Sequence, residues 1–196
     1  MSKWGQDAAR VSDLRERRES DYQRWKDLDS HNTGWVNRIK LAVQHIPKGS
    51  SVLELGAGHA FMRDLIDASC SYQAADIVAH QPDFLVIDLN KPYRLPQRYD
   101  VIVALGVFEY VFDVAAALER LKGSAKRIIF TYCCHVPSND SDLRMRQGWL
   151  SDLNERALDA IIDEKRFEVR RKSSIQDTAG FKQIMYVIDT DNRKDH

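Results

Sequence analysis

The chain has 196 residues, which suits one α/β domain and is short for two. It carries 29 basic and 29 acidic residues, so it lacks the net positive field that draws proteins to nucleic acid or anionic lipid. The N-terminal segment has no apolar signal-peptide core, and no apolar run approaches the roughly 18 residues of a membrane span. We therefore expect a cytoplasmic globular protein with no nucleic-acid partner and no membrane span.

The cysteine pattern agrees with this location. Cys70, Cys133 and Cys134 are odd in number, and none of them forms a C-x-x-C pair. Reduced thiols are expected from this pattern, and no metal site is predicted.

Amphipathic helices are predicted for the first quarter of the chain. Apolar and aromatic side chains recur at steps of three and four from Val11 to Leu28. The segment DSHNTG then interrupts the pattern, and a second helical stripe runs from Trp35 to Ile46. We predict a single domain in which these helices, within 1–48, cap a core at 49–190 and the tail at 191–196 is frayed.

Strands and helices alternate through the core. Strands are predicted at 50–55, 71–76, 83–89, 99–106, 127–134, 167–175 and 181–190, and helices at 60–69, 108–122 and 153–165. This alternation indicates a doubly wound α/β sheet, and the continuous apolar runs fit strands that are covered on both faces. Only IVAHQPD separates Asp76 from Phe84, so that crossover is predicted to be a loop.

A glycine-rich stretch, VLELGAGHA at 52–60, follows the first strand of this core. The apolar run ends at Glu54, and Gly56 and Gly58 follow at alternate positions. Glycine lets a ligand approach the backbone closely, and ligands of doubly wound sheets lie beyond the carboxyl ends of the strands. A dinucleotide-binding fingerprint would need glycine at Phe61, so a nicotinamide cofactor is disfavoured.

The stretch resembles the first motif of class I S-adenosylmethionine-dependent methyltransferases, with Ala60 in place of the third glycine. Asp76 after the second strand, Asp88 in VIDLN and the segment LGVFEY match later motifs of the same family in the same order. The resemblance is clear over 50–121 and looser in the closing strands. The chain also resembles small bacterial members of this family. It implies a Rossmann-like, seven-stranded, mostly parallel sheet with a final antiparallel strand and an N-terminal helical cap.

The resemblance also implies how S-adenosylmethionine is held. The family's acidic residues, here Glu54, Asp76 and Asp88, meet the ammonium, the ribose hydroxyls and the adenine amino group, respectively. The other cofactor-binding positions that it implies are Gly56, Ala57, Gly58, Ile77, Leu89 and Leu105. Alternatives stay open, because Glu54 is also compatible with a solvated strand end, and Asp76 and Asp88 with ordinary turns.

The implied reaction is in-line methyl transfer to an oxygen or nitrogen of a small molecule or glycan. His135 and Tyr132, at the end of the fifth strand, are the candidates for acid–base or positioning roles, because imidazole titrates near neutral pH. The candidates for substrate contact are Trp35, Tyr110, Arg144 and Trp149. The alternatives are a polar loop histidine, a helix start at Tyr110, a solvated arginine and tryptophans that serve packing.

Two other function classes remain as alternatives. A cofactor-binding module without catalysis, or a partner subunit, is possible from sequence because no single base stands out. A nicotinamide-dependent oxidoreductase is less favoured, for the reason given above for Phe61. The sequence does not indicate an oligomeric state.

Overall fold

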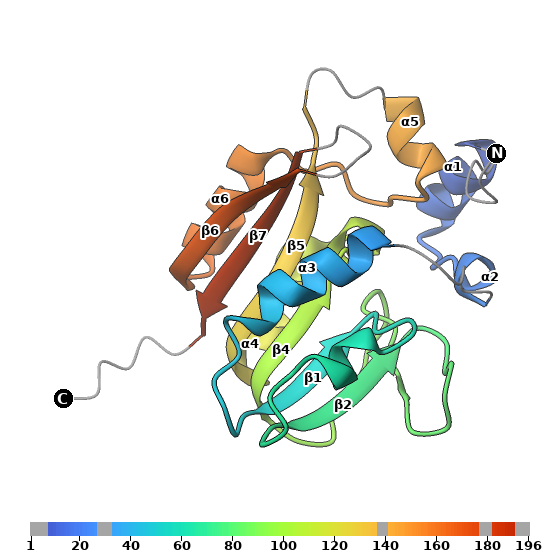
Figure 1. The fold of residues 1–196 in the computed structure, drawn as a ribbon. Coiled ribbons are helices and arrows are strands. Elements are labelled where there is room, and N and C mark those ends of the chain that lie inside the picture. The colour runs from blue at the N-terminus through green and yellow to red at the C-terminus, as the bar shows by residue number, and fades with distance from the viewer. Residues whose placement is uncertain (1–7, 27–32, 137–140, 177–181, 191–196) are drawn as a thin grey trace.

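The computed structural model describes residues 8–26, 33–136, 141–176 and 182–190. Its strands form one seven-stranded sheet in the order β3-β2-β1-β4-β5-β7-β6 (Figure 1). The strands are β1 (Ser51–Leu55), β2 (Ser71–Asp76), β3 (Leu85–Val86), β4 (Tyr99–Leu105), β5 (Ala125–Cys134), β6 (Glu168–Gln176) and β7 (Lys182–Asp189).

Strands β1 to β5 run parallel, whereas β7 pairs antiparallel with both β5 and β6. The predicted mostly parallel sheet with a final antiparallel strand is therefore confirmed. The last strand of the chain does not lie at the edge of the sheet, because β7 inserts between β5 and β6. The parallel strands place their carboxyl ends at one edge, where the predicted motifs meet.

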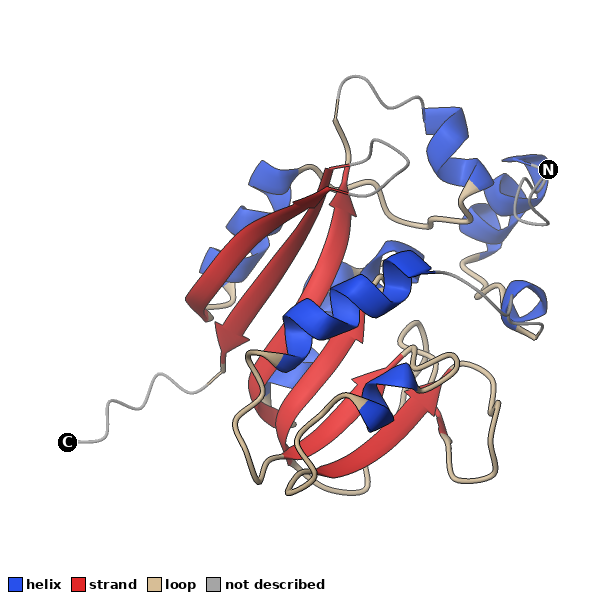
Figure 2. Ribbon diagram, in the orientation of Figure 1, coloured by secondary structure: helices blue, strands red, loops and turns tan. Residues whose placement is uncertain are grey.

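Helices cover both faces of the sheet (Figure 2). They are α1 (Ala8–Arg17), α2 (Tyr22–Trp25), α3 (Thr33–Val43), α4 (Val114–Lys122), α5 (Ser141–Arg146) and α6 (Glu155–Glu164), together with the 3-10 turns η1 (Phe61–Asp64) and η2 (Phe108–Tyr110). On one face, α4 and α6 bury a cluster that includes Leu118 and Phe130. On the other, α3 and η1 bury Ile39, Met62 and Ile129. Side chains of β5 alternate between the two clusters, as expected of a strand covered on both sides.

The N-terminal helix that was predicted as continuous is divided into α1 and α2. Arg18 has a left-handed backbone, with φ of 53°, which ends α1. Asp21 then caps α2 by accepting a hydrogen bond from the backbone N–H of Arg24 at 3.0 Å. Figure 1 shows α1 beside α5, far from it in sequence. The predicted tail at 191–196 lies outside the described residues.

The first crossover helix is much shorter than predicted. Instead of a helix at 60–69, the chain forms only η1, one 3-10 turn. Asp67 ends this region by accepting hydrogen bonds from the backbone N–H and the hydroxyl of Ser69, at 3.0 and 2.6 Å. Such local side-chain contacts compete with helix formation.

Two further boundaries were wrong. The strand predicted at 83–89 contributes only β3, because Asp88 turns back to accept a hydrogen bond from the Asn90 N–H at 2.9 Å. The helix predicted at 108–122 is divided into η2 and α4, because Asp113 makes a new N-cap with the Ala116 N–H at 2.8 Å. The predicted loop between Asp76 and Phe84 is confirmed, since no helix occurs at 77–83.

Candidate functional site

The glycine-rich loop folds across the carboxyl ends of β1 and β2. Gly56, Gly58 and Ala60 have φ angles of 67°, 53° and 57°, so the chain takes the left-handed conformation at every second residue. Glycine adopts it freely, whereas alanine pays roughly 1 kcal/mol or more. The Ala57 N–H bonds to the Ala75 carbonyl at 3.1 Å, and the Gly58 N–H bonds to Asp76 Oδ2 at 2.9 Å. These bonds fix the loop over the edge of the sheet.

Two carboxyl groups are buried under this loop. Glu54 is 4% exposed and Asp76 is 8% exposed. Tyr72, on the neighbouring β2, donates its hydroxyl hydrogen bond to Glu54 Oε2. Burial raises the pKa of Glu54 to about 8, and the charge of Asp76 acts in the same direction. Burial also raises the pKa of Asp76, opposed by hydrogen bonds from Gly58 and Ile77, whose N–H lies 2.7 Å from Oδ1.

Asp88 joins the third strand region to the N-terminal helices. Its Oδ1 accepts from the Ser20 hydroxyl at 2.9 Å, and its Oδ2 accepts from the Tyr22 hydroxyl at 2.7 Å. Leu89, the next residue, is buried, and its carbonyl accepts a hydrogen bond from Arg120 at 2.7 Å. The carboxylate predicted to meet adenine thus holds the cap in this structure.

Arg38 is a site residue that the sequence reasoning missed. It projects from α3 onto Gly106, at the end of β4, where a Cβ atom would lie 2.8 Å from its Nη1. Gly106 has a φ of 71°, and Leu105 before it packs half-buried under α3. Among the residues that the structure describes, Arg38 Nε has no hydrogen-bond partner. The sequence indicates Arg38 only through its position beside the apolar stripe of the second predicted helix.

The two predicted acid–base candidates lie on β5 and just after it, with β4 between them and β1. Tyr132 is fully buried, and its hydroxyl binds the Ser151 hydroxyl at 3.0 Å and the Leu153 N–H at 3.0 Å. Burial raises its pKa to about 12, which does not suit a base near neutral pH. His135 is half-buried, and its backbone N–H bonds to the Leu153 carbonyl at 2.8 Å.

Of the substrate candidates, Arg144 and Trp149 belong to the protein interior. Arg144 is 0% exposed, so the alternative of a solvated arginine is wrong. Its guanidinium donates to Asp152 Oδ1, the Cys133 carbonyl and the Ser151 carbonyl, at 2.7, 3.1 and 3.2 Å. It also lies 4.5 Å from the centre of the Trp149 ring. These contacts agree with the packing interpretation of Trp149.

Tyr110 and Trp35 lie on the cap side of the site. The Tyr110 ring meets Trp25 of α2 edge-on at 4.9 Å, and its hydroxyl donates to the Gln147 carbonyl at 3.3 Å. Trp35 is half-buried on α3, nearly one turn before Arg38. Tyr110 therefore lies where α2 approaches the chain after β4, and Trp35 lies on the helix that brings Arg38 to Gly106.

Glu109 is a second residue that the sequence reasoning did not include among the site residues. It lies in η2, the short turn that follows β4, and is 1% exposed. Its Oε1 accepts the Cys133 N–H at 2.7 Å, whereas its Oε2 has no hydrogen-bond partner in the described part of the chain. Burial raises the pKa of Glu109, and the Cys133 hydrogen bond and the Arg38 charge act against that shift.

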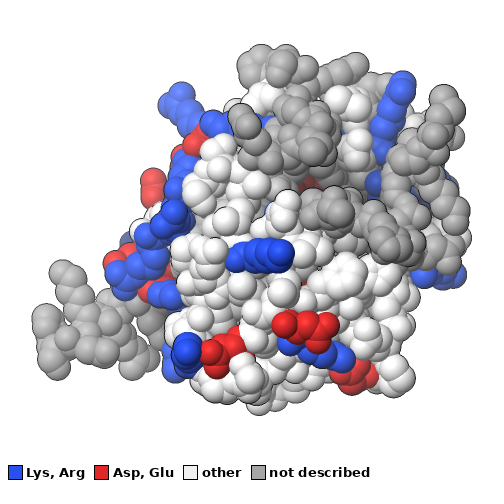
Figure 3. Space-filling model, in the orientation of Figure 1, with Lys and Arg blue, Asp and Glu red and all other residues white. Residues whose placement is uncertain are grey.

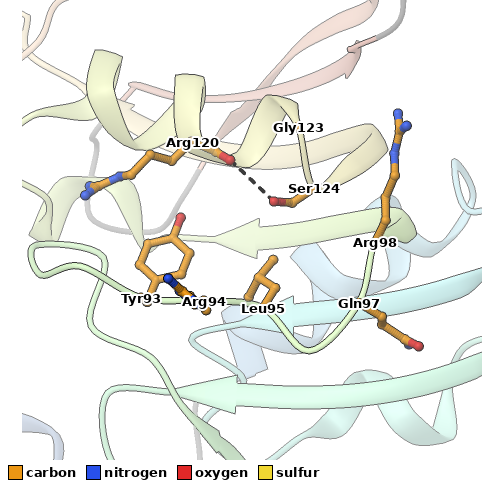
Figure 4. A pocket seen from close by; sticks show the side chains of 8 residues that line it. All are labelled: Tyr93, Arg94, Leu95, Gln97, Arg98, Arg120, Gly123 and Ser124. Atoms are coloured by element: carbon orange, nitrogen blue, oxygen red, sulfur yellow. Dashed lines mark hydrogen bonds between the residues drawn. The ribbon is translucent and has the colours of Figure 1, made fainter.

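A surface hollow of about 420 Å³ lies elsewhere (Figure 4). It is lined by Tyr93, Arg94, Leu95, Gln97, Arg98, Arg120, Gly123 and Ser124, next to the starts of β4 and β5. The glycine-rich loop lies at the opposite ends of the strands, so this hollow is separate from the candidate site.

Figure 3 shows the face that carries α3, where charged side chains gather mainly toward the edges.

Comparisons with known proteins identify a family for this chain. The profile of a family described as methyltransferase domain matches residues 22–170. No curated protein matches the chain. Among the described residues, no helix has the length and apolar character needed to cross a membrane, and Cys70, Cys133 and Cys134 form no disulfide.

Three solved structures illustrate the shared fold. A magnesium protoporphyrin IX methyltransferase from Synechocystis, with bound S-adenosylhomocysteine, is 17% identical with a TM-score of 0.62 and covers 93% of this chain and 100% of its own. An N-methyltransferase from Bradyrhizobium japonicum is 13% identical with a TM-score of 0.62, over 91% and 97% of the two chains. A 1,6-didemethyltoxoflavin N1-methyltransferase from Burkholderia thailandensis is 15% identical with a TM-score of 0.65, over 92% and 88%.

Proposed function

Because the chain belongs to the methyltransferase domain family, we propose that it methylates a small molecule or glycan at a nitrogen or an oxygen. The resemblance predicted from the glycine-rich stretch and the strand-end carboxylates is confirmed, and with it an S-adenosylmethionine-dependent methyltransferase. The identity of the acceptor belongs to the proposal. So does the role of each site residue, which we derive from the geometry described above.

The observation that most strongly supports this proposal is that Asp76, the Gly58 N–H and Glu54 lie together at the carboxyl ends of β1 and β2. S-adenosylmethionine has a ribose diol, an ammonium and a carboxylate. Asp76 suits the diol, since a carboxylate accepts from two hydroxyls, and Glu54 suits the ammonium. Arg38 suits the carboxylate, because its Nε has no hydrogen-bond partner among the described residues. A guanidinium group can also donate two parallel hydrogen bonds to one carboxylate.

Of the expected cofactor contacts, the contact between Asp88 and adenine differs most from the expectation. Asp88 already accepts from Ser20 and Tyr22, so an adenine amino group must share the carboxylate or displace one of these donors. A carboxylate oxygen has two lone pairs, and Oδ2 accepts only from Tyr22 among hydrogen bonds of the described residues. Sharing is therefore compatible with the chemistry, and it would place the cap directly over the adenine.

When bound, S-adenosylmethionine supplies a methyl group made electrophilic by the sulfonium. The chain's own residues hold the cofactor, orient the acceptor and exclude water. Trp35 and Tyr110 are the aromatic side chains placed to bound the acceptor on the cap side. His135 stays a candidate for accepting a proton, and Tyr132 would act only through Ser151, which its hydroxyl contacts.

Calorimetric titration with S-adenosylhomocysteine tests the proposal, with NAD and NADP as controls. We expect micromolar binding of S-adenosylhomocysteine alone, and a loss of at least about 30-fold in Asp76→Ala, because two charge-assisted hydrogen bonds disappear. Asp83→Ala, an exposed carboxylate after the same strand, is the matched control and should bind normally. Binding of a nicotinamide cofactor instead, or unchanged affinity in Asp76→Ala, would contradict the proposal.

A further inference from the structure

Glu109 is the buried acid whose side chain the fold leaves half satisfied. Its backbone carbonyl accepts the N–H groups of Leu150 and Ser151 at 2.7 and 3.1 Å, so its main chain is held on the 149–151 segment. Its Oε1 is held by Cys133 of β5. A buried polar atom without a partner is destabilising, so Oε2, which has no hydrogen-bond partner among the described residues, calls for a ligand.

The position of Oε2 suits an acceptor of methyl groups. Glu109 follows β4, the central strand between β1 and β5, and therefore lies at the edge where ligands of such sheets bind. Thr131, on the same face of β5 as Cys133, is fully buried and its hydroxyl also lacks a hydrogen-bond partner among the described residues. Glu109, which follows β4, and Thr131, on the adjacent β5, each carry a buried polar atom without a hydrogen-bond partner among the described residues, and this indicates a place for a polar ligand.

We propose that Glu109 Oε2 is a catalytic contact to the acceptor, and that the acceptor presents an amine. This inference rests on the proposed function and names its substrate class. An amine N–H donates a hydrogen bond to Oε2 while the nitrogen lone pair remains free to attack. The aromatic ring of Tyr110, which clusters with Cys133, supplies further surface that favours a cationic nitrogen.

The charge balance explains why a carboxylate suits an amine better than an alcohol. The nitrogen forms its bond to the methyl carbon as the carbon–sulfur bond breaks, and that electron pair remains on sulfur. The nitrogen becomes positive in this step, and a fixed carboxylate stabilises the developing charge. The proton that the nitrogen then sheds passes to Glu109 Oε2. An alcohol is a far weaker acid than an alkylated ammonium, so a carboxylate is a poor base for it.

Sinefungin provides a direct test that does not depend on turnover. In this cofactor analogue a carbon bearing an amine replaces the methylated sulfur, so the amine occupies the place where methyl and acceptor meet. Binding of sinefungin and S-adenosylhomocysteine is measured by calorimetry on wild type, Glu109→Gln and Glu119→Gln. Glutamine preserves the acceptor for the Cys133 N–H, and Glu119 is an exposed acid on α4 that loses the same charge.

We expect wild type and Glu119→Gln to bind sinefungin at least about tenfold more tightly than S-adenosylhomocysteine. In Glu109→Gln that ratio should fall to near one, with the affinity for S-adenosylhomocysteine unchanged within about twofold. An unchanged ratio in Glu109→Gln would overturn this inference alone. Loss of both ligands in Glu109→Gln would also overturn it, because Glu109 would then serve the fold or the cofactor. Failure of wild type to bind either ligand would instead overturn the proposed function, and this inference with it.

Discussion

Glu54 is a carboxyl group whose charge state depends on what binds beside it. Its pKa of about 8 means that the carboxyl group is mostly protonated at pH 7 when the site holds no cation. Tyr72 keeps its hydroxyl proton and can donate to Glu54 in that state, because burial raises the pKa of Tyr72 as well. An ammonium placed against Glu54 would favour the ionised form and expel the proton.

We therefore predict that binding of S-adenosylhomocysteine at pH 7 releases about one proton in wild type. Calorimetry in buffers of different ionisation enthalpy measures this number. Glu54→Gln should release none, and Glu119→Gln, which alters an exposed acid, should behave as wild type. Equal proton release in wild type and Glu54→Gln would show that another group titrates.

The same residue sets a pH dependence of stability. Because the folded protein holds the Glu54 proton more tightly than the unfolded chain does, its contribution is full below the ordinary pKa of 4.5 and is lost as pH rises toward 8. The unfolding free energy of the ligand-free wild type should fall across this interval more steeply than that of Glu54→Gln. Denaturant titrations at several pH values provide the comparison.

Gly106 serves two purposes, a left-handed turn and room for Arg38. Gly106→Ala adds a Cβ atom 2.8 Å from Arg38 Nη1 at a φ of 71°. Gly49→Ala is a matched control, because its φ is 73° and nothing lies within 4 Å of the added atom. Both variants should lose about 1–2 kcal/mol of unfolding free energy from the backbone conformation.

Only Gly106→Ala should also weaken S-adenosylhomocysteine, by about tenfold or more, because Arg38 must move away from the methionine end. Thermal melts and calorimetry on the two variants separate the effects. Equal affinities in the two variants would show that Arg38 does not contact the cofactor.

At the scale of elements, the cap is attached by polar contacts. Arg15 of α1 donates to the Trp149 carbonyl at 2.6 and 3.1 Å and pairs with Asp152 at 2.9 Å. Ser20 and Tyr22 hold Asp88, as described above. Polar attachment makes α1 and α2 the part of the cap that opens most easily, because Val11 is the one buried apolar side chain within these two helices.

Tyr22→Phe should loosen the cap without unfolding the core. Loss of a hydrogen bond to a carboxylate costs about 1–2 kcal/mol, so amide exchange at 8–26 should rise roughly tenfold. Tyr93→Phe is the control, since the Tyr93 hydroxyl has no hydrogen-bond partner in the part of the chain that the structure describes. Hydrogen–deuterium exchange by mass spectrometry gives the result. Unchanged exchange in Tyr22→Phe would mean that the cap is held by other contacts.

At the scale of the whole molecule, the two faces of the sheet have different tasks. The face under α4 and α6 buries a large apolar cluster. The face under α3 carries Glu54, on the same side of β1 as Val52, and α3 itself brings Arg38 to Gly106 at the ligand edge. A defect in the first cluster should therefore reduce stability and spare the site.

Leu118→Ala tests this division. Leu118 is 0% exposed on α4, so the variant should lose about 2–5 kcal/mol of unfolding free energy. Leu143→Ala, at a position 41% exposed on α5, should change it by less than about 0.5 kcal/mol. Below its melting temperature, Leu118→Ala should bind S-adenosylhomocysteine within about twofold of wild type. Denaturant titration and calorimetry measure both quantities, and a large loss of affinity would contradict a separation of the faces.

The sequence by itself determined the order of strands and helices, the glycine-rich turn and the carboxylates at the ends of β1 and β2. These features depend on local periodicity, and parallel strands bring their ends to one edge in any such sheet. Boundaries failed where single side chains, such as Asp67 and Asp113, bonded to nearby backbone and ended or began a helix.

Only the tertiary structure decided which distant side chains complete the site. Arg38 reaches Gly106 from a helix 68 positions earlier, Glu109 binds Cys133 across 24 positions, and Tyr22 reaches Asp88 across 66. Arg144 illustrates the same limit, because its sequence context fits a solvated arginine as well as a fully buried one. Contacts of this kind depend on how helices pack on the sheet, and no local pattern of residues specifies that packing.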